Sequence, residues 1–190
     1  MAKSGKNPLG KARRSIWFVL RAVLIISVIL GLGYAVFTEA MYISNMFIVA
    51  TEGMAARAKT VLENGSASEL DQYFTADFIE KDELLNSGAY LDYAVESYDY
   101  RYDILGISVL PWAKTGSVTY IERIPTIRAT AVSEEVQGPV TPWIPMHYKV
   151  NLVKIDGRWL IDSLTVVEEN PPEEVRPTPD YSQIESTKRP

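Results

Sequence analysis

The segment VNLVKIDGRWLIDSLTV, residues 150–166, has the pattern of two β-strands joined by a tight turn. Its Asp156-Gly157 dipeptide favours a type I′ hairpin turn, in which both central residues have positive φ. The turn also sets the register, so that Ile155 is expected opposite Arg158, Lys154 opposite Trp159, and Leu152 opposite Ile161. Turn geometry explains Asp156, which is therefore not a catalytic candidate.

The two faces of this hairpin differ in polarity, because successive side chains of a strand point to opposite sides. The mostly apolar face holds Tyr148, Val150, Leu152, Trp159 and Ile161. The mixed face holds His147, Asn151, Val153, Leu160, Asp162 and Leu164, with Asp162 expected directly opposite Asn151. Few charges protect either strand from edge-to-edge association, so both are expected to pair within a larger sheet.

Aromatic and β-branched runs separated by proline and glycine predict the strands of this sheet. Their ranges are 98–109, 117–124, 126–133, 144–155 and 158–167. Helical patterns precede them. Helices followed by a run of strands are typical of the α+β class, here with a curved, mostly antiparallel sheet packed on the helices.

Three helices are predicted ahead of the strands. The first is expected to continue from the apolar segment at residues 15–38 and to stop at Asn64-Gly65. Its apolar stripe consists of Ile43, Met46, Phe47, Ala50, Met54, Ala58, Val61 and Leu62. Glu52, Arg57, Lys59 and Glu63 are expected to lie largely off that stripe. The second helix begins at the capping-box pattern SASE, residues 66–69, and presents Leu70, Tyr73, Phe74 and Phe78. The third, over 81–94, is weakened by Gly88.

The segment SIWFVLRAVLIISVILGLGYAVFT, residues 15–38, predicts a membrane-spanning helix. Residues 22–38 carry no charge, and about 17–25 such residues cross the hydrocarbon layer. Arg21 can reach the headgroups and let the residues before it join the span. The basic residues ahead of the span favour an N-terminus inside the cell and the remaining chain outside.

Two other interpretations of this segment stay open. A cleaved signal peptide fits the basic start, although the apolar run is longer than usual and TEA, residues 38–40, is a poor cleavage site. A buried core helix fits badly with apolar residues on every face. With a membrane span, the chain divides into a basic cytoplasmic N-terminus (1–14), a transmembrane helix (15–38), an extracytoplasmic α+β domain (39–167) and a disordered proline-rich, acidic tail (168–190).

Composition excludes several kinds of site. The chain has 190 residues, no cysteine and one histidine, which rules out disulfides, thiolate chemistry and multi-histidine metal sites. We expect no cofactor and no metal. All 24 acidic residues follow Thr38, whereas six of the 19 basic residues precede it. The acidic part of the chain argues against nucleic acid as a partner, because binding phosphates needs a basic patch.

The order of three motifs resembles the nuclear transport factor two superfamily of cone-shaped α+β domains. The motifs are a long helix ending near KTVLENGSASEL (59–70), the aromatic segment LDQYFTADFI (70–79) and the hairpin VNLVKIDGRWLIDSLTV. The resemblance implies helices that close a cone formed by a curved sheet. A short basic end, one span and a small outward domain are also similar in layout to the assembly subunits of bacterial conjugation and type IV secretion machines, and to small anchored envelope proteins.

The superfamily includes isomerases, dehydratases and polyketide cyclases, which implies one functional hypothesis. An enzyme of this type needs an acid–base pair inside a dry pocket. His147 and Asp162 are the candidates because the expected register places both on the same face of the sheet, and the tyrosines and Asp103 could assist them. The alternative is that His147 is an ordinary sheet residue.

The hypothesis favoured here is a non-catalytic interaction or scaffold domain of a bacterial envelope assembly. Its candidate contact residues are aromatic: Trp112 and Trp143 beside prolines in predicted loops, and Tyr98, Tyr100 and Tyr102 on one face of a strand. Packing within the domain is the alternative for each. The implied partners are the lipid bilayer, other envelope or membrane proteins, and a second copy of the chain.

Overall fold

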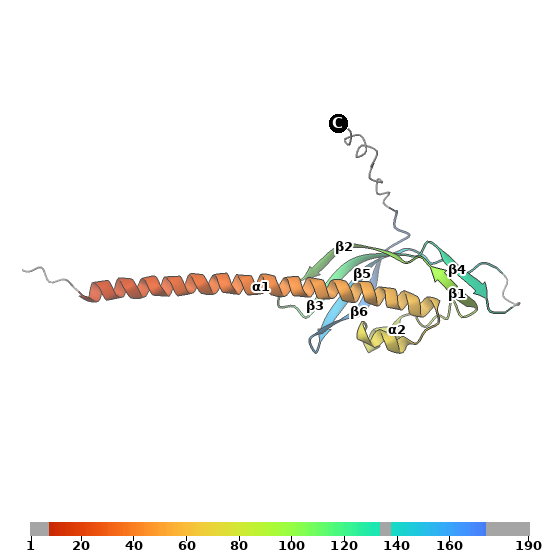
Figure 1. Cartoon of the computed structure of the whole chain (residues 1–190), viewed down its shortest axis with the longest axis horizontal. Coiled ribbons are helices and arrows are strands. Elements are labelled where there is room, and N and C mark those ends of the chain that lie inside the picture. Colours follow the sequence, from red (N-terminus) through yellow and green to blue (C-terminus); the bar gives the residue numbers. More distant parts are fainter. Residues whose placement is uncertain (1–7, 134–137, 174–190) are drawn as a thin grey trace, which may run out of the picture.

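The computed structural model describes residues 8–133 and 138–173 (Figure 1). The described chain has an α+β architecture in which one long helix, α1 (Pro8–Leu62), continues into the domain and packs against an antiparallel sheet. The first half of α1 projects away from the domain, as Figure 1 shows. The predicted α+β class, the antiparallel sheet and the long apolar N-terminal helix are thus confirmed.

The two halves of α1 differ in exposure. Between Ile16 and Phe37 its large apolar side chains are exposed, so this part is not buried in the described domain. The helix contains a segment long and apolar enough to cross a membrane. Further along, one face is fully buried, formed by Met46, Ala50, Met54, Ala58 and Leu62. The helix ends where predicted, with Asn64 at φ 53° and the Gly65 amide donating to the carbonyl oxygen of Thr60.

The segment after α1 differs from the prediction. The expected second helix is split into a short 3-10 helix, η1 (Ala67–Gln72), and α2 (Ala76–Lys81). Thr75 interrupts the segment because its amide donates to Ile161 in the sheet, while its hydroxyl accepts from the Phe78 amide and caps α2. The predicted third helix is wrong, since residues 82–92 form turns and Gly88 has a φ of 63°.

Six strands follow in the described chain. They are β1 (Tyr93–Tyr98), β2 (Arg101–Val109), β3 (Thr115–Arg123), β4 (Ile127–Ala131), β5 (Met146–Ile155) and β6 (Arg158–Glu169). The larger sheet has the order β2-β3-β5-β6, and β1 pairs with β4 in a smaller sheet. The sequence did not predict β1, and it started β2 three residues too early.

The hairpin β5–β6 has the predicted turn and the predicted register near the turn. Asp156 and Gly157 have φ values of 49° and 85°, as a type I′ turn requires, and Lys154 lies opposite Trp159. The expectation of an internal position is correct for β5 and wrong for β6, which forms an edge of the larger sheet as described. Residues 73–75 cover part of that edge, because the Ile161 amide donates to Tyr73 and the Thr75 amide donates to Ile161.

A β-bulge changes the sheet face to which the side chains of β6 point from Ser163 onward. Asn151 lies opposite Ser163 instead of Asp162, so the expected pair of Asn151 and Asp162 is wrong. The Asn151 amide instead donates to the hydroxyl of Ser163 at 3.2 Å. One extra residue in a strand reverses the facing of those that follow. Leu164 consequently lies opposite Val150 and packs against the apolar core.

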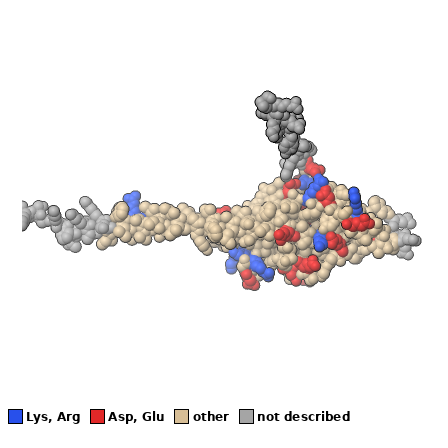
Figure 2. All heavy atoms as spheres, in the orientation of Figure 1, with Lys and Arg blue, Asp and Glu red and all other residues tan. Residues whose placement is uncertain are grey.

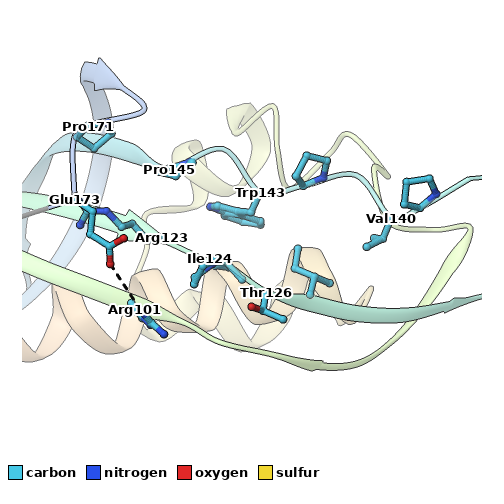
Figure 3. Close-up of a pocket in the computed structure, with 13 residues that line it drawn as sticks. Arg101, Arg123, Ile124, Thr126, Val140, Trp143, Pro145, Pro171 and Glu173 are labelled. Atoms are coloured by element: carbon cyan, nitrogen blue, oxygen red, sulfur yellow. Dashed lines mark ion pairs between the residues drawn. The ribbon is translucent and has the colours of Figure 1, made fainter. Parts of the chain in front are cut away.

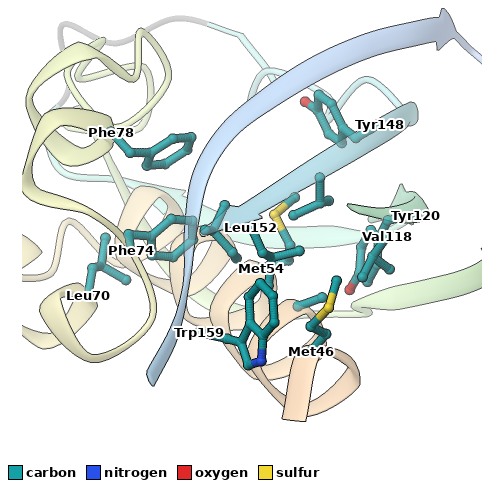
Figure 4. Packing of buried hydrophobic residues seen from close by; sticks show 13 residues of the cluster. Met46, Met54, Leu70, Phe74, Phe78, Val118, Tyr120, Tyr148, Leu152 and Trp159 are labelled. Carbon is teal, nitrogen blue, oxygen red and sulfur yellow. The ribbon is translucent and has the colours of Figure 1, made fainter. Parts of the chain in front are cut away.

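The core fills the space between α1 and the larger sheet. Figure 4 shows Met46 and Met54 from α1 near Leu152 and Trp159 from the sheet, with Phe74 beside them. Phe74 also stacks on Phe78 with ring centroids 4.7 Å apart. The apolar face predicted for the hairpin is confirmed, because Tyr148, Val150, Leu152, Trp159 and Ile161 are all buried.

The end of the described chain is ordered beyond the predicted strand. β6 continues to Glu169, and the Asn170 amide donates to the carbonyl oxygen of Pro145 at 2.9 Å. The Arg123 guanidinium donates to the carbonyl oxygen of Pro172 at 3.1 Å. Residues 168–173 therefore pack on the domain instead of starting the tail. The rest of the predicted tail, 174–190, lies outside the described residues, as do residues 1–7.

Candidate functional site

The structure does not bring His147 and Asp162 together. His147 lies on the outer face of the sheet, opposite Glu168 in the β5–β6 pair, and lines a surface hollow with Ile121. Asp162 is exposed at the bulge, where its carboxylate accepts from the Thr75 hydroxyl at 3.4 Å. Asp162 and Glu168 are six residues apart in β6, which corresponds to about 20 Å along a strand. The two side chains therefore do not form an acid–base pair in this arrangement.

The two loop tryptophans have opposite environments. Trp143 is 7% exposed and stacks on Tyr90 with ring centroids 6.4 Å apart. Trp112 lies between β2 and β3 and is 78% exposed. Trp143 is thus a packing residue, whereas Trp112 is available for contact with another molecule.

The three candidate tyrosines do not share one strand. Tyr98 ends β1 and Tyr102 lies in β2, with Tyr100 between the strands. Tyr98 packs against a second, smaller group of buried residues: Ala58, Val61, Leu62, Tyr90, Ile124 and Trp143. Tyr102, 44% exposed, stacks on Tyr120 at 5.6 Å, and the hydroxyl of Tyr100 hydrogen-bonds that of Tyr120 at 2.9 Å.

A buried charged cluster, formed by Arg57, Asp82 and Glu122, is the most unusual polar feature of the described chain. The Arg57 guanidinium binds the Asp82 carboxylate through Nε and Nη2, with an Nη2–Oδ2 distance of 2.9 Å. The Asp82 side chain is held at the end of α2, where its Oδ1 also accepts from the Leu85 amide. Both charged side chains are less than one tenth exposed. Such a forked pair has fixed geometry and is stronger than a surface ion pair.

Glu122 is the second acid that faces Arg57. It is fully buried in β3, and its Oε2 lies 4.0 Å from Arg57 Nη1. Neither of its carboxylate oxygens, nor Arg57 Nη1, makes a hydrogen bond of good geometry with any residue in the described ranges. Buried polar atoms are rarely left in this condition, since an unmade hydrogen bond costs about 1–3 kcal/mol.

Burial controls the ionisation of this cluster. Desolvation raises the pKa of Glu122 to about 7, although Arg57 and, more weakly, Tyr100 pull it downward. Desolvation acts against the charge on Arg57, but Glu122 and Asp82 outweigh it and leave the pKa of Arg57 raised. Burial also raises the pKa of Tyr148 to about 12, partly offset by the nearby Arg57. Glu122 is therefore expected to titrate near neutral pH, while Arg57 stays charged.

The charged cluster borders a surface cavity of about 520 Å³ between α2 and β6. Arg57, Asp82 and Tyr148 line it, together with Leu164 at the bulged strand. Glu122 does not line the cavity but faces Arg57 from β3. Within the described residues no group of three acidic or histidine side chains is placed to hold a metal ion. The arrangement is suited to a polar ligand that reaches Arg57, or to a structural role.

A second cavity, of about 500 Å³, lies between the β3–β4 connection and residues 139–145 (Figure 3). Figure 3 shows Trp143 above Ile124 and Thr126, with Arg101 and Arg123 at one end. Both arginines are already engaged: Arg101 with Asp99, and Arg123 with Asp103 at 2.9 Å. The charges at this cavity are therefore committed to internal pairs.

Sequence reasoning missed the charged cluster and expected Arg57 to lie largely off the apolar stripe of α1. Arg57 is only 3% exposed. A signal was present, because Arg57 follows Met54 by three residues on the helix and Glu122 alternates with Val118 and Tyr120 on the core face of β3.

Comparisons of the chain with protein-family models, with curated proteins and with solved structures found no match.

Proposed function

We propose that the protein is a single-pass membrane protein whose α+β domain lies outside the cell and acts as an interaction or scaffold domain of the bacterial envelope. One observation carries this proposal: α1 is uninterrupted from Pro8 to Leu62, with an exposed apolar first half and a buried face in its second half. An exposed apolar helix of this length has a high cost in water. A bilayer would cover it, and the domain would then be held at a fixed distance from the membrane.

The packing between α1 and the sheet favours a scaffold over an enzyme of the cone type. Met46, Met54, Phe74 and Trp159 occupy the space where such an enzyme would need an open pocket. The residues expected to form an acid–base pair lie outside that space. We further propose that the domain is of the cone-shaped nuclear transport factor two type. The support for this is the order of its helices and strands along the chain, and the curved sheet that packs on a long helix.

Site-specific photocrosslinking of the full-length protein in intact cells tests the scaffold role. A photoreactive residue is placed at exposed apolar positions such as Leu91, Leu105 and Ile144. A scaffold gives a reproducible adduct of one defined mass at a subset of these positions. The buried position Leu70 serves as the control, and the probe there should give no adduct. Absence of adducts at every exposed position would contradict the proposal.

The cavity at Arg57 favours a second candidate function, the binding of a small polar ligand or its chemical conversion. Arg57 lines this cavity and faces Glu122, a buried acid with a pKa near 7, and groups with strongly shifted pKa values are common at functional sites. A ligand of this cavity should raise the Tm of the wild-type protein. It should not raise that of Val166→Trp, in which a large side chain opposite Tyr148 at the cavity wall fills the space. Turnover of a small molecule by the domain would place this function first.

A further inference from the structure

The end of the domain from which the first half of α1 emerges is fixed by contacts with α1. The ring of Tyr42 lies 5.5 Å from that of Trp159, and Lys154 Nζ lies 3.9 Å from the Tyr42 ring centre. One turn further, Met46 packs so closely on Gly116 that an added Cβ would lie 2.6 Å from its Cε. The β2–β3 loop (residues 110–114) and the β5–β6 turn therefore lie beside this part of α1 (Figure 1).

This end of the domain is close to the limit of the proposed membrane span. Thr38 is the last residue before the first acidic side chain, Glu39. Tyr42 follows Thr38 by four residues, or about 6 Å along a helix. The headgroup region is about 5–8 Å thick on each side of the hydrocarbon. With α1 as the anchor, Lys154 and the elements around it thus lie at headgroup level.

The β2–β3 loop exposes apolar side chains at this level. Trp112 is 78% exposed and Leu110 is 57% exposed. Tryptophan is enriched where bilayers meet water, because its ring is apolar and its N–H can still bond to polar groups. An interfacial position would cover both side chains, which otherwise stand in water.

Basic side chains surround the loop. Lys114 and Lys154 are neighbours, since the Lys154 amide donates to the Lys114 carbonyl oxygen at 2.7 Å, and Arg158 follows the hairpin turn. Figure 2 shows basic side chains gathered at the end of the domain from which the first half of α1 emerges, with one acidic group among them. Acidic residues near this end include Glu39 in α1, Asp156 in the hairpin turn, and Asp162, which lines the same surface hollow as Leu110. Phosphates of lipid headgroups are the counter-charges that three cations at this depth would meet.

We propose that the β2–β3 loop and the β5–β6 turn rest on the surface of the membrane that α1 crosses, with Trp112 at the boundary of headgroups and acyl chains. The ligand is an anionic phospholipid surface. This inference rests on the proposed membrane anchor. Its consequence is a domain held in one orientation by two attachments, the helix and the loop, instead of one that swings on the helix alone.

Tryptophan fluorescence of the full-length chain in vesicles tests this contact. Trp17→Phe leaves Trp112 as the exposed tryptophan of the described chain, since Trp143 and Trp159 are buried. The vesicles contain phosphatidylcholine and phosphatidylglycerol, with bromine either near the headgroups or deep in the acyl chains. We expect shallow bromine to quench W17F more than the matched control W17F/W112F, and to quench Trp112 more than deep bromine does. K114S/R158S in the W17F background should reduce this difference.

Flotation of the vesicles separates the two proposals. Protein that floats, but whose quenching is the same with and without Trp112, overturns the surface contact and leaves the anchor intact. Protein that does not float overturns the anchor, and the surface contact with it. Equal quenching of Trp112 by shallow and deep bromine also overturns the boundary position.

Discussion

Arg57 Nη1 lies 4.0 Å from Glu122 Oε2, and both side chains are buried between α1 and the sheet. The distance is too long for a hydrogen bond. Arg57 instead directs its hydrogen bonds to Asp82, at 2.9–3.1 Å. One cation thus faces two acids, and only one of them is closely paired. The stability of the domain should depend on the charge of the other.

Stability is expected to fall as the pH rises from about 4.5 to about 7, because the pKa of Glu122 is raised from 4.5 to about 7 by folding. In this window the folded protein keeps a proton that the unfolded chain has released. The protonation of Glu122 contributes at most about 3 kcal/mol to the free energy of unfolding. This contribution is fully present below pH 4.5 and is lost above pH 7. Glu122→Gln should remove this loss, as measured by denaturant unfolding in detergent at pH 5 and pH 8. The exposed Glu96→Gln should keep the wild-type pH dependence, and an unchanged dependence in Glu122→Gln would show that another group is responsible.

Arg57→Met should destabilise the domain by about 3–5 kcal/mol at neutral pH, because it leaves two buried acids without a cation. Lys59→Met, in the same helix but exposed, should change the free energy of unfolding by no more than about 0.5 kcal/mol. The same unfolding measurement serves both variants. Equal effects of the two substitutions would mean that the charged cluster contributes no specific stability.

Gly116→Ala should destabilise the domain by about 1–3 kcal/mol, the usual cost of overpacking. The added Cβ would lie 2.6 Å from Met46 Cε and 3.0 Å from the Ser108 carbonyl oxygen, and the backbone atom cannot easily move. Gly106 in the adjacent strand has nothing within 4 Å of an added Cβ. Gly106→Ala is therefore the control and should not lower the Tm. A neutral Gly116→Ala would contradict the close approach of α1 to the sheet.

Local chemistry explains which parts of the fold could be predicted. The Asp156-Gly157 turn is determined by two residues that accept positive φ, and it sets the nearby register without help from the rest of the chain. The apolar stripe of α1 is equally local. These features survive in any tertiary context, so the sequence pattern was sufficient for them.

The errors arise where distant residues decide the outcome. Phe74 and Thr75 interrupt the second helix because they pair with Ile161 in β6, a contact that no local pattern indicates. The bulge at Asp162 inserts one residue and reverses the facing of Leu164, and a period-two pattern contains no signal for it. A strand such as β6 can be long and apolar at an edge when another segment covers it.

The candidate site was missed for a similar reason. Arg57 was expected to lie largely off the apolar stripe and Glu122 was left out, because charged residues are seldom fully buried. Each becomes tolerable in the core only because the other elements bring Asp82 to Arg57 and aromatic rings around Glu122. Their positions on apolar faces were visible in the sequence, but their partners were not.

Cysteine accessibility in intact cells tests the membrane topology most directly, because the chain has no cysteine of its own. Ser133 is exposed two residues after the end of β4, and Ser4 precedes the apolar segment in the sequence. A membrane-impermeant maleimide should label Ser133→Cys in intact cells and Ser4→Cys only after lysis, with both variants remaining in alkaline-washed membranes. Labelling of Ser4→Cys alone in intact cells would reverse the orientation, and recovery of either variant in the soluble fraction would contradict the anchor.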